Sequence, residues 1–167
     1  YDKKLCVDGM GVYKIKHNTI DTIVVKDADI KPSTVAPFIE YCNVKFYQGD
    51  FKDLAGLSYD FVVNAANCNL AHGGGVAKAI DHYTGGKLQK LSTSFVKKNG
   101  KVATGECVMI DTGKLKVLNA VGPRKGKDAE SLLNTVYTNI FARKGVPLMP
   151  LISCGIFGFD IKDSLRT

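Results

Sequence analysis

The pattern of apolar and polar positions predicts strands and helices in turn over the middle of the chain. Residues 61–63 are an apolar run typical of a strand that is buried on both faces. A helical pattern begins at Val76, and a second one over residues 88–96 has Leu88, Leu91 and Phe95 at helical spacing. We expect Asn99 and Gly100 to end that second helix.

The same alternation continues in the second half of the chain. Strands are predicted over residues 108–110 and 117–121, on either side of a turn at residues 112–113. A helix over residues 129–142 and an apolar segment over residues 147–152 follow, and Asp160 is expected to cap a last helix. This order predicts an α/β, three-layer (α/β/α) domain with a central mixed, mostly parallel sheet.

The first part of the chain has a different, β-rich pattern. Residues 11–16 and 22–25 flank His17 and Asn18, which predicts a hairpin-like segment within residues 1–30. Prolines and small polar residues then predict a linker over residues 31–43. A short strand from Val44 begins the predicted domain of residues 44–167, and Asp50 is placed to cap a helix over residues 51–57.

Composition describes an ordinary globular chain of 167 residues, 45% hydrophobic and 23% charged. The formal net charge of +7 favours an anionic partner, which leaves a nucleotide, a nucleic acid or a phosphorylated ligand open. The pattern contains neither a signal peptide nor an apolar run near the ~20 residues of a membrane helix, so we predict no membrane contact by this domain.

Cysteine usage indicates a reduced, cytosolic setting. The five cysteines are odd in number and irregular in spacing, and they contain no Cys-x-x-Cys pair. We therefore predict no metal site and no cofactor, because the three histidines make no convincing ligand set with these cysteines. A cysteine nucleophile paired with His72 stays open as an alternative. The cysteines are Cys6, Cys42, Cys68, Cys107 and Cys154.

Two junctions between a strand and a helix carry the candidate chemistry. After the strand at residues 61–63 come Asn64 and Asn67, then three glycines at residues 73–75 and a helix start. Glycines allow close approach to a phosphate, and a helix N-terminus directs unpaired N–H groups at it. A similar glycine-containing loop covers residues 153–158. We expect both loops at the carboxyl edge of the sheet, where they would hold a diphosphate between them.

With these motifs the chain resembles the coronavirus macro domain, or X domain, of the large replicase non-structural protein. The resemblance covers roughly residues 44–167. It is carried by VNAAN at residues 63–67, HGGGVA at 72–77, NAVGP at 119–123 and SCGIFG at 153–158. Family members continue past residues 164–166 with another strand and helix. The resemblance therefore implies a domain without its last strand and helix, and places residues 1–30 at the end of a preceding domain.

The resemblance also implies a site. Asp50 would accept a hydrogen bond from the adenine amino group, and Asn67 would hold the distal ribose hydroxyls. An ionised Asp only accepts hydrogen bonds, which suits an amino group, whereas Asn offers both donor and acceptor. The catalytic set is Asn67, Gly74 and Phe157. The ligand-binding set is Asp50, Phe51, Ala65, Asn67, His72, Gly73, Gly74, Gly75, Val76, Pro150, Leu151, Ser153, Cys154, Gly155, Ile156 and Phe157.

The activity implied is ADP-ribose binding with hydrolysis of mono-ADP-ribose from protein carboxylates, or dephosphorylation of ADP-ribose 1″-phosphate. The glycine loops contain no Asp or Glu, so a positioned water would be the nucleophile. The implied partners are ADP-ribose and mono-ADP-ribosylated proteins. The implied setting is the host cytoplasm, as a monomeric domain of a membrane-associated viral replication protein.

Two alternatives stay open at this point. One is a non-catalytic ADP-ribose reader that uses the same loops. The other is a weak RNA-binding module that uses the lysines of residues 87–101 and the loop at Arg124. We favour a solvated helix face over a nucleic-acid surface for those lysines.

Overall fold

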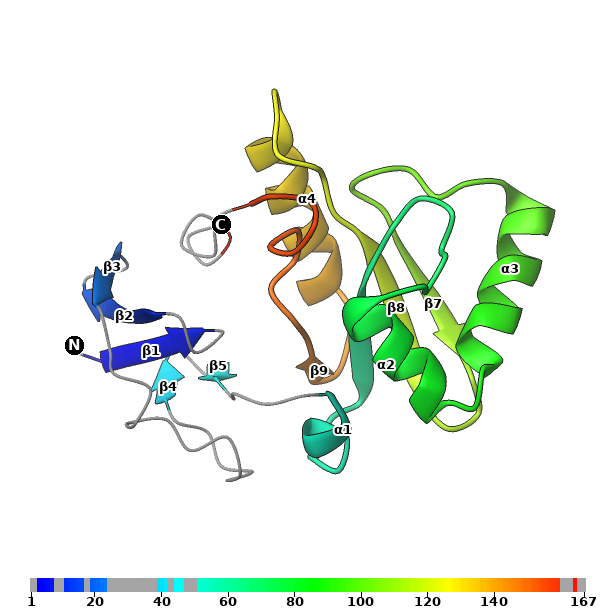
Figure 1. The fold of residues 1–167 in the computed structure, drawn as a ribbon, viewed down its shortest axis with the longest axis horizontal. Coiled ribbons are helices and arrows are strands. Elements are labelled where there is room, and N and C mark those ends of the chain that lie inside the picture. Colours follow the sequence, from blue (N-terminus) through cyan, green and yellow to red (C-terminus); the bar gives the residue numbers. More distant parts are fainter. Residues whose placement is uncertain are drawn as a thin grey trace. The chain divides into compact units, whose positions relative to one another are not determined.

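The computed structural model describes residues 51–159 and Ser164, together with the backbone of five short strands before residue 50 (Figure 1). It divides the chain into two compact units, residues 1–57 with 160–166 and residues 58–159 with 167. The predicted site loops belong to the second unit, which is the one built around a mixed sheet.

The first unit contains the β-rich segment. β1 (Lys3–Val7), β2 (Gly11–Lys16) and β3 (Thr19–Ile23) form an antiparallel sheet, so the predicted hairpin is confirmed, with its second strand starting earlier than expected. β4 (Ile39–Tyr41) pairs antiparallel with β5 (Val44–Phe46), and β4 falls inside the expected linker. The boundaries of the linker and of residues 44–167 stay a prediction.

Two expectations around residue 50 have different outcomes. The helix expected over residues 51–57 is the shorter α1 (Phe51–Leu54). The capping role of Asp50 lies outside the described residues, as does the last helix expected after Asp160, of which Ser164 alone is described.

The second unit is built on a four-stranded sheet with the order β7-β8-β6-β9. β6 (Phe61–Ala66) pairs in parallel with β8 (Lys116–Val121) on one side and with β9 (Pro147–Leu148) on the other. β7 (Cys107–Asp111) pairs antiparallel with β8 across the predicted turn. The sheet is therefore mixed and mostly parallel, and the predicted α/β class is confirmed.

Helices cover both faces of this sheet. Successive residues of a strand point to opposite sides, so β6 has apolar side chains on each face for a helix to cover. Phe61 and Val63 join Leu133 and Val136 of α4 (Ala129–Phe141) in one buried cluster. On the other face, Ala66 joins a cluster that includes half-buried Phe95. That residue belongs to α3 (Lys87–Asn99), which follows α2 (Gly75–Tyr83). Figure 1 shows α4 on one side of the sheet and α2 and α3 on the other.

The strand expected over residues 147–152 is much shorter in the structure, where β9 covers only Pro147 and Leu148. Proline has no N–H to donate to a ladder and is confined to sheet edges and strand ends, so Pro147 and Pro150 limit this strand. Residues 149–158 consequently run as an irregular segment beyond the sheet. In the part of the chain that is described, no helix has the length and apolar character needed to cross a bilayer.

Leu133→Ala is expected to destabilise the second unit by about 2–5 kcal/mol, because it leaves a cavity in the cluster between α4 and the sheet. Urea unfolding of the whole chain measures this loss. Leu91→Ala is the matched control, because Leu91 on α3 is 39% exposed and its loss should change the free energy by about 0.5 kcal/mol or less. Equal losses in the two variants would contradict the assigned core.

Candidate functional site

Three loops leave the same edge of the sheet. β6, β8 and β9 are parallel, so their carboxyl ends lie together, and residues 67–74, 122–128 and 149–158 follow those ends. Figure 1 shows the 67–74 loop and the 149–158 segment at the upper end of the sheet. The two glycine-containing loops thus follow adjacent strands, as a shared phosphate site requires.

The first loop ends in an uncapped helix N-terminus. Gly74 is the N-cap of α2 and makes no side-chain capping hydrogen bond. Gly75 has φ +56°, in the left-handed region that favours glycine. Residues 73–76 are exposed, and a side chain at Gly73 or Gly74 would meet open space. The first N–H groups of α2 therefore point at solvent, where they can receive an anion.

Asn67 closes the loop that it begins. Its Oδ1 accepts the backbone N–H groups of Asn69 and Ala71, each at 3.1 Å, and its Nδ2 donates to the carbonyl of Ala71 at 2.9 Å. Two acceptor sites and one of two N–H groups are thus used locally, which leaves one N–H for a ligand. We expected Asn67 to offer both a donor and an acceptor to two ribose hydroxyls. In this conformation its side chain can offer a ribose only one donated hydrogen bond.

His72 is the centre of a buried chain of polar side chains. Asn64 on β6 donates Nδ2 to Asn119 Oδ1 on β8 at 2.9 Å and lies 3.2 Å from His72 Nδ1. His72 Nε2 lies 2.9 Å from Ser92 Oγ on α3. All four residues are buried, with His72 the most exposed at 4%. The chain fastens the glycine loop to the sheet on one side and to α3 on the other.

The partners define the state of the His72 ring. The Asn64 amide faces Nδ1 and the Ser92 hydroxyl faces Nε2, so both ring nitrogens have a polar partner, and the tautomer follows the orientation of the amide. Burial lowers the pKa of His72, and the nearby Asp81 carboxylate offsets part of that shift. The ring is thus neutral and held on both sides, which fits neither a general base nor the partner of a cysteine nucleophile.

The backbone of the same residue is held as well. The N–H of His72 donates to Gln89 Oε1 at 2.7 Å, and the N–H of Gln89 donates to Asp81 Oδ1 at 2.7 Å. Gln89 Nε2 also donates to the carbonyl of Leu70 at 3.3 Å. One α3 side chain thus orders the loop at two points. Gln89 and Ser92 were missed by sequence reasoning, because on a helix they look like ordinary surface residues.

The second loop, residues 153–158, begins with a strained residue. Ser153 has φ +66°, and its buried Oγ has no hydrogen-bond partner in the described part of the chain. Ile156 is 89% exposed, and Phe157 is half-buried. Strained backbone and unpaired buried polar atoms cluster at functional sites. The loop therefore exposes the apolar side chain of Ile156 to solvent, while Ser153 at its start is held in a strained backbone conformation.

The remaining predicted residues are placed as follows. Ala65 is exposed near the end of β6, and Pro150, Leu151 and Cys154 are half-buried in the segment after β9. Phe51 begins α1 in the other unit. The adenine side of the predicted site, which needs Asp50 and Phe51, stays a prediction.

Comparison with known proteins decides the family. Residues 63–167 match the family described as Macro domain. This chain belongs to the Macro domain family. Its similarity to coronavirus replicases confirms the expected resemblance: it is 50% identical over 169 residues to replicase polyprotein 1ab of Bat coronavirus 512/2005. That alignment covers 99% of this chain but only 2% of the polyprotein's length.

Solved structures show the same relationship. The IBV X-domain is 34% identical, with a TM-score of 0.56 over 68% of this chain and 70% of that one. A variant of the Oceanobacillus iheyensis macrodomain with ADPR is 29% identical, with a TM-score of 0.60 over 67% and 68% of the two chains. The sheet and loops described above are thus those of a macro domain.

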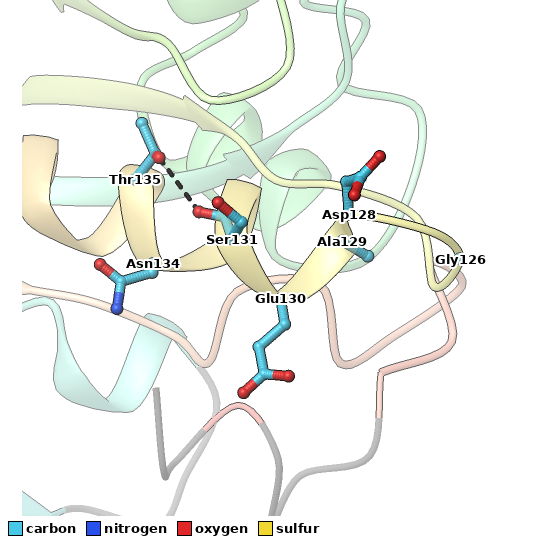
Figure 2. Close-up of a pocket in the computed structure, with 7 residues that line it drawn as sticks. All are labelled: Gly126, Asp128, Ala129, Glu130, Ser131, Asn134 and Thr135. Atoms are coloured by element: carbon cyan, nitrogen blue, oxygen red, sulfur yellow. Dashed lines mark hydrogen bonds between the residues drawn. The ribbon is translucent and has the colours of Figure 1, made fainter.

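This macro domain also has an open depression of about 650 Å³ that the predicted residues do not line. Figure 2 shows its lining in the loop before α4 and the first turns of that helix. The carboxylates of Asp128 and Glu130 disfavour an anion there, so this depression does not replace the site at the glycine loops. Its lining residues are Gly126, Asp128, Ala129, Glu130, Ser131, Asn134 and Thr135.

The pH dependence of stability tests the state of His72. Because its pKa is lowered in the folded macro domain, the unfolded chain takes up the proton first as pH falls below about 6.5. The stabilisation by the neutral ring is therefore complete above about pH 6.5 and declines below it, until the folded pKa is passed. Urea unfolding at several values between about pH 7.5 and 5 should show this decline.

His72→Gln should show a smaller decline over the same pH range. His82→Gln removes an exposed histidine of α2 and should retain the wild-type difference. A decline that persists unchanged in His72→Gln would show that His72 is not its source.

Proposed function

We propose that this macro domain binds ADP-ribose at the loops after β6 and β9 and hydrolyses mono-ADP-ribose from modified protein carboxylates. Dephosphorylation of ADP-ribose 1″-phosphate is the second reaction open to the same site. The observation that carries the proposal is the uncapped N-terminus of α2 behind an exposed glycine run, in a chain similar to a macrodomain with ADPR. Such a terminus binds a phosphate through backbone N–H groups.

The diphosphate would lie between the two loops. Residues 73–76 provide backbone donors without side chains that block them, and the 153–158 loop is expected to close from the other side. Phe157 would lie near the distal ribose. Asp50 and Phe51 would contact the adenine, and Pro150 and Leu151 would line its pocket. The positive helix end and the basic chain both favour the ligand's two negative charges.

Catalysis would depend on orientation. Residues 67–76 and 149–158 contain no Asp or Glu, and the His72 ring is neutral and bonded at both nitrogens. A water held against the anomeric carbon, with a ligand phosphate as its base, is the remaining nucleophile. The free N–H of Asn67 would hold a distal ribose hydroxyl and thereby fix that carbon. Turnover by positioning alone is expected to be modest.

Asn67→Ala is expected to abolish removal of ADP-ribose from a modified protein while leaving measurable ADP-ribose binding. The alanine removes the ribose contact and the three bonds that close the loop, whereas the N-terminus of α2 remains. Calorimetry with ADP-ribose and a de-ADP-ribosylation assay on the same sample measure both effects.

Asn69→Ala is the matched control, because only the backbone N–H of Asn69 is used to close the loop. It should keep both activities. Wild-type cleavage by Asn67→Ala would refute the role of Asn67. Binding without any cleavage by the unaltered chain would instead favour the non-catalytic reader.

The similarity to coronavirus replicases supports a proposal for the partners and the location. We propose mono-ADP-ribosylated proteins as the protein partners, and the host cytoplasm as the location, within a membrane-associated viral replication protein. The domain would act as a monomer and reverse host ADP-ribosylation.

A weak RNA contact is the second candidate, because of the lysines on α3. Lys87, Lys90, Lys97 and Lys98 are all exposed, and α3 has no acidic residue in its sequence. At 100° per residue they lie on the side of the helix away from buried Leu88 and Ser92. A helix side with several lysines and no carboxylate attracts a phosphate backbone without reading its sequence, although Ser94 separates Lys90 from Lys97.

Lys90→Gln/Lys97→Gln is expected to weaken binding of a single-stranded RNA and to lower its salt dependence by about 0.7 in log–log slope for each phosphate that is no longer neutralised. ADP-ribose affinity should not change. Lys116→Gln/Lys144→Gln removes the same charge elsewhere and is the control. Equal weakening by both pairs would indicate a general charge effect, and fluorescence anisotropy at several salt concentrations distinguishes the outcomes.

A further inference from the structure

The loop after β8 lies directly against the 153–158 loop. A Cβ at Gly122 would fall 2.5 Å from Ile152 Cγ2 and well inside contact distance of Ser153 Oγ. Only a residue without a side chain allows this approach. Gly122 therefore lets the start of the second loop rest on bare backbone at the end of β8.

Two further contacts join these loops, from the second and third residues after Gly122. The backbone N–H of Lys125 donates to the carbonyl of Phe157 at 2.8 Å. The guanidinium of Arg124 lies over the Phe157 ring, 4.9 Å from its centroid. This distance is within the range of a cation–π interaction. Phe157 is thus held at its main-chain carbonyl by Lys125 and at its half-buried ring by the side chain of Arg124.

We infer that Arg124 is a positioning residue for the 153–158 loop, which it holds in the ligand-binding conformation by stacking on Phe157. That ADP-ribose is the ligand rests on the proposed function. That Arg124 holds the loop rests on the contacts described above. The loop has exposed Ile156 at its tip and, at its base, a strained Ser153 whose buried Oγ has no partner in the described part of the chain. Two backbone hydrogen bonds close the loop itself, from Gly158 N–H to the Gly155 carbonyl and from Phe159 N–H to the Ser153 carbonyl, each at 3.0 Å. The Phe157 ring is contacted by Arg124 from the neighbouring loop.

The alternative is that Arg124 attracts the diphosphate directly as a charge. The two mechanisms differ in what they require of Phe157. A direct attraction between two charges is independent of the ring and is weakened by salt. Stacking needs an aromatic face, and it disappears when the ring is replaced by an aliphatic side chain.

A double-mutant cycle separates the two mechanisms. Arg124→Ala is expected to weaken ADP-ribose binding by about two- to fivefold, which corresponds to an exposed cation–π contact. In a Phe157→Leu background the same substitution should have no further effect, whereas in a Phe157→Tyr background the loss should return. Calorimetry at low and moderate salt measures each corner of the cycle.

Lys127→Ala is the matched control, because it removes one positive charge from the same exposed loop. It should bind ADP-ribose as the unaltered chain does. An equal loss in Lys127→Ala, or a loss from Arg124→Ala that persists in Phe157→Leu, would overturn the inference in favour of direct charge attraction.

A second readout does not need the ligand. The Lys125 N–H is protected by the Phe157 carbonyl, so its hydrogen exchange should speed up in Arg124→Ala and stay unchanged in Lys127→Ala. If the unaltered chain fails to bind ADP-ribose, the proposed function fails, and this exchange rate still decides whether Arg124 holds the loop. Unchanged exchange in Arg124→Ala would refute the positioning role.

Discussion

The hydrogen bonds of one buried amide hold this site together. Asn64 lies on β6, an inner strand of the mixed sheet, and links Asn119 on β8 to His72 in the glycine loop. The His72 ring in turn contacts Ser92 on α3. A buried polar group without a partner costs about 1–3 kcal/mol, so each of these hydrogen bonds holds its two members together. Asn64 Oδ1 and Asn119 Nδ2 have no partner in the described part of the chain. These hydrogen bonds order the loop before α2 from its buried side, which no ligand reaches. The exposed side of the loop stays free of side chains.

This arrangement explains why the proposed site consists mainly of backbone. An anion at a helix N-terminus is recognised by N–H groups whose directions are set by the helix, and side chains would only limit the approach. The macro domain meets this need with residues 73–76, which are exposed, and with polar side chains turned inward. The second loop has no such buried chain beneath it among the described residues. Its base is held by the hydrogen bond from Ile152 N–H to the Tyr137 hydroxyl and by the close approach of Gly122. Phe157 is contacted by Lys125 and Arg124.

Sequence reasoning identified both loops because their signals are local. Residues 73–75 precede a helical pattern and follow an apolar run, which predicts a turn between a strand and a helix. The strands and helices of the second unit were found for the same reason. Asn64 and Asn119 were visible as polar residues within apolar strands, which was a usable signal for a buried polar pair. β9 was predicted too long, because apolar periodicity does not register the missing N–H groups of Pro147 and Pro150.

By itself the sequence determined the α/β class, the glycine loops, the uncapped start of α2 and the family, since all of these depend on residues close together along the chain. Only the tertiary structure decided what holds the loops. The bonds of Asn64 to Asn119 and of His72 to Ser92 join residues 55 and 20 positions apart, and the stacking of Arg124 on Phe157 joins two separate loops. Such pairs leave no periodic trace, because they depend on which strands become neighbours in the sheet rather than on spacing along the chain.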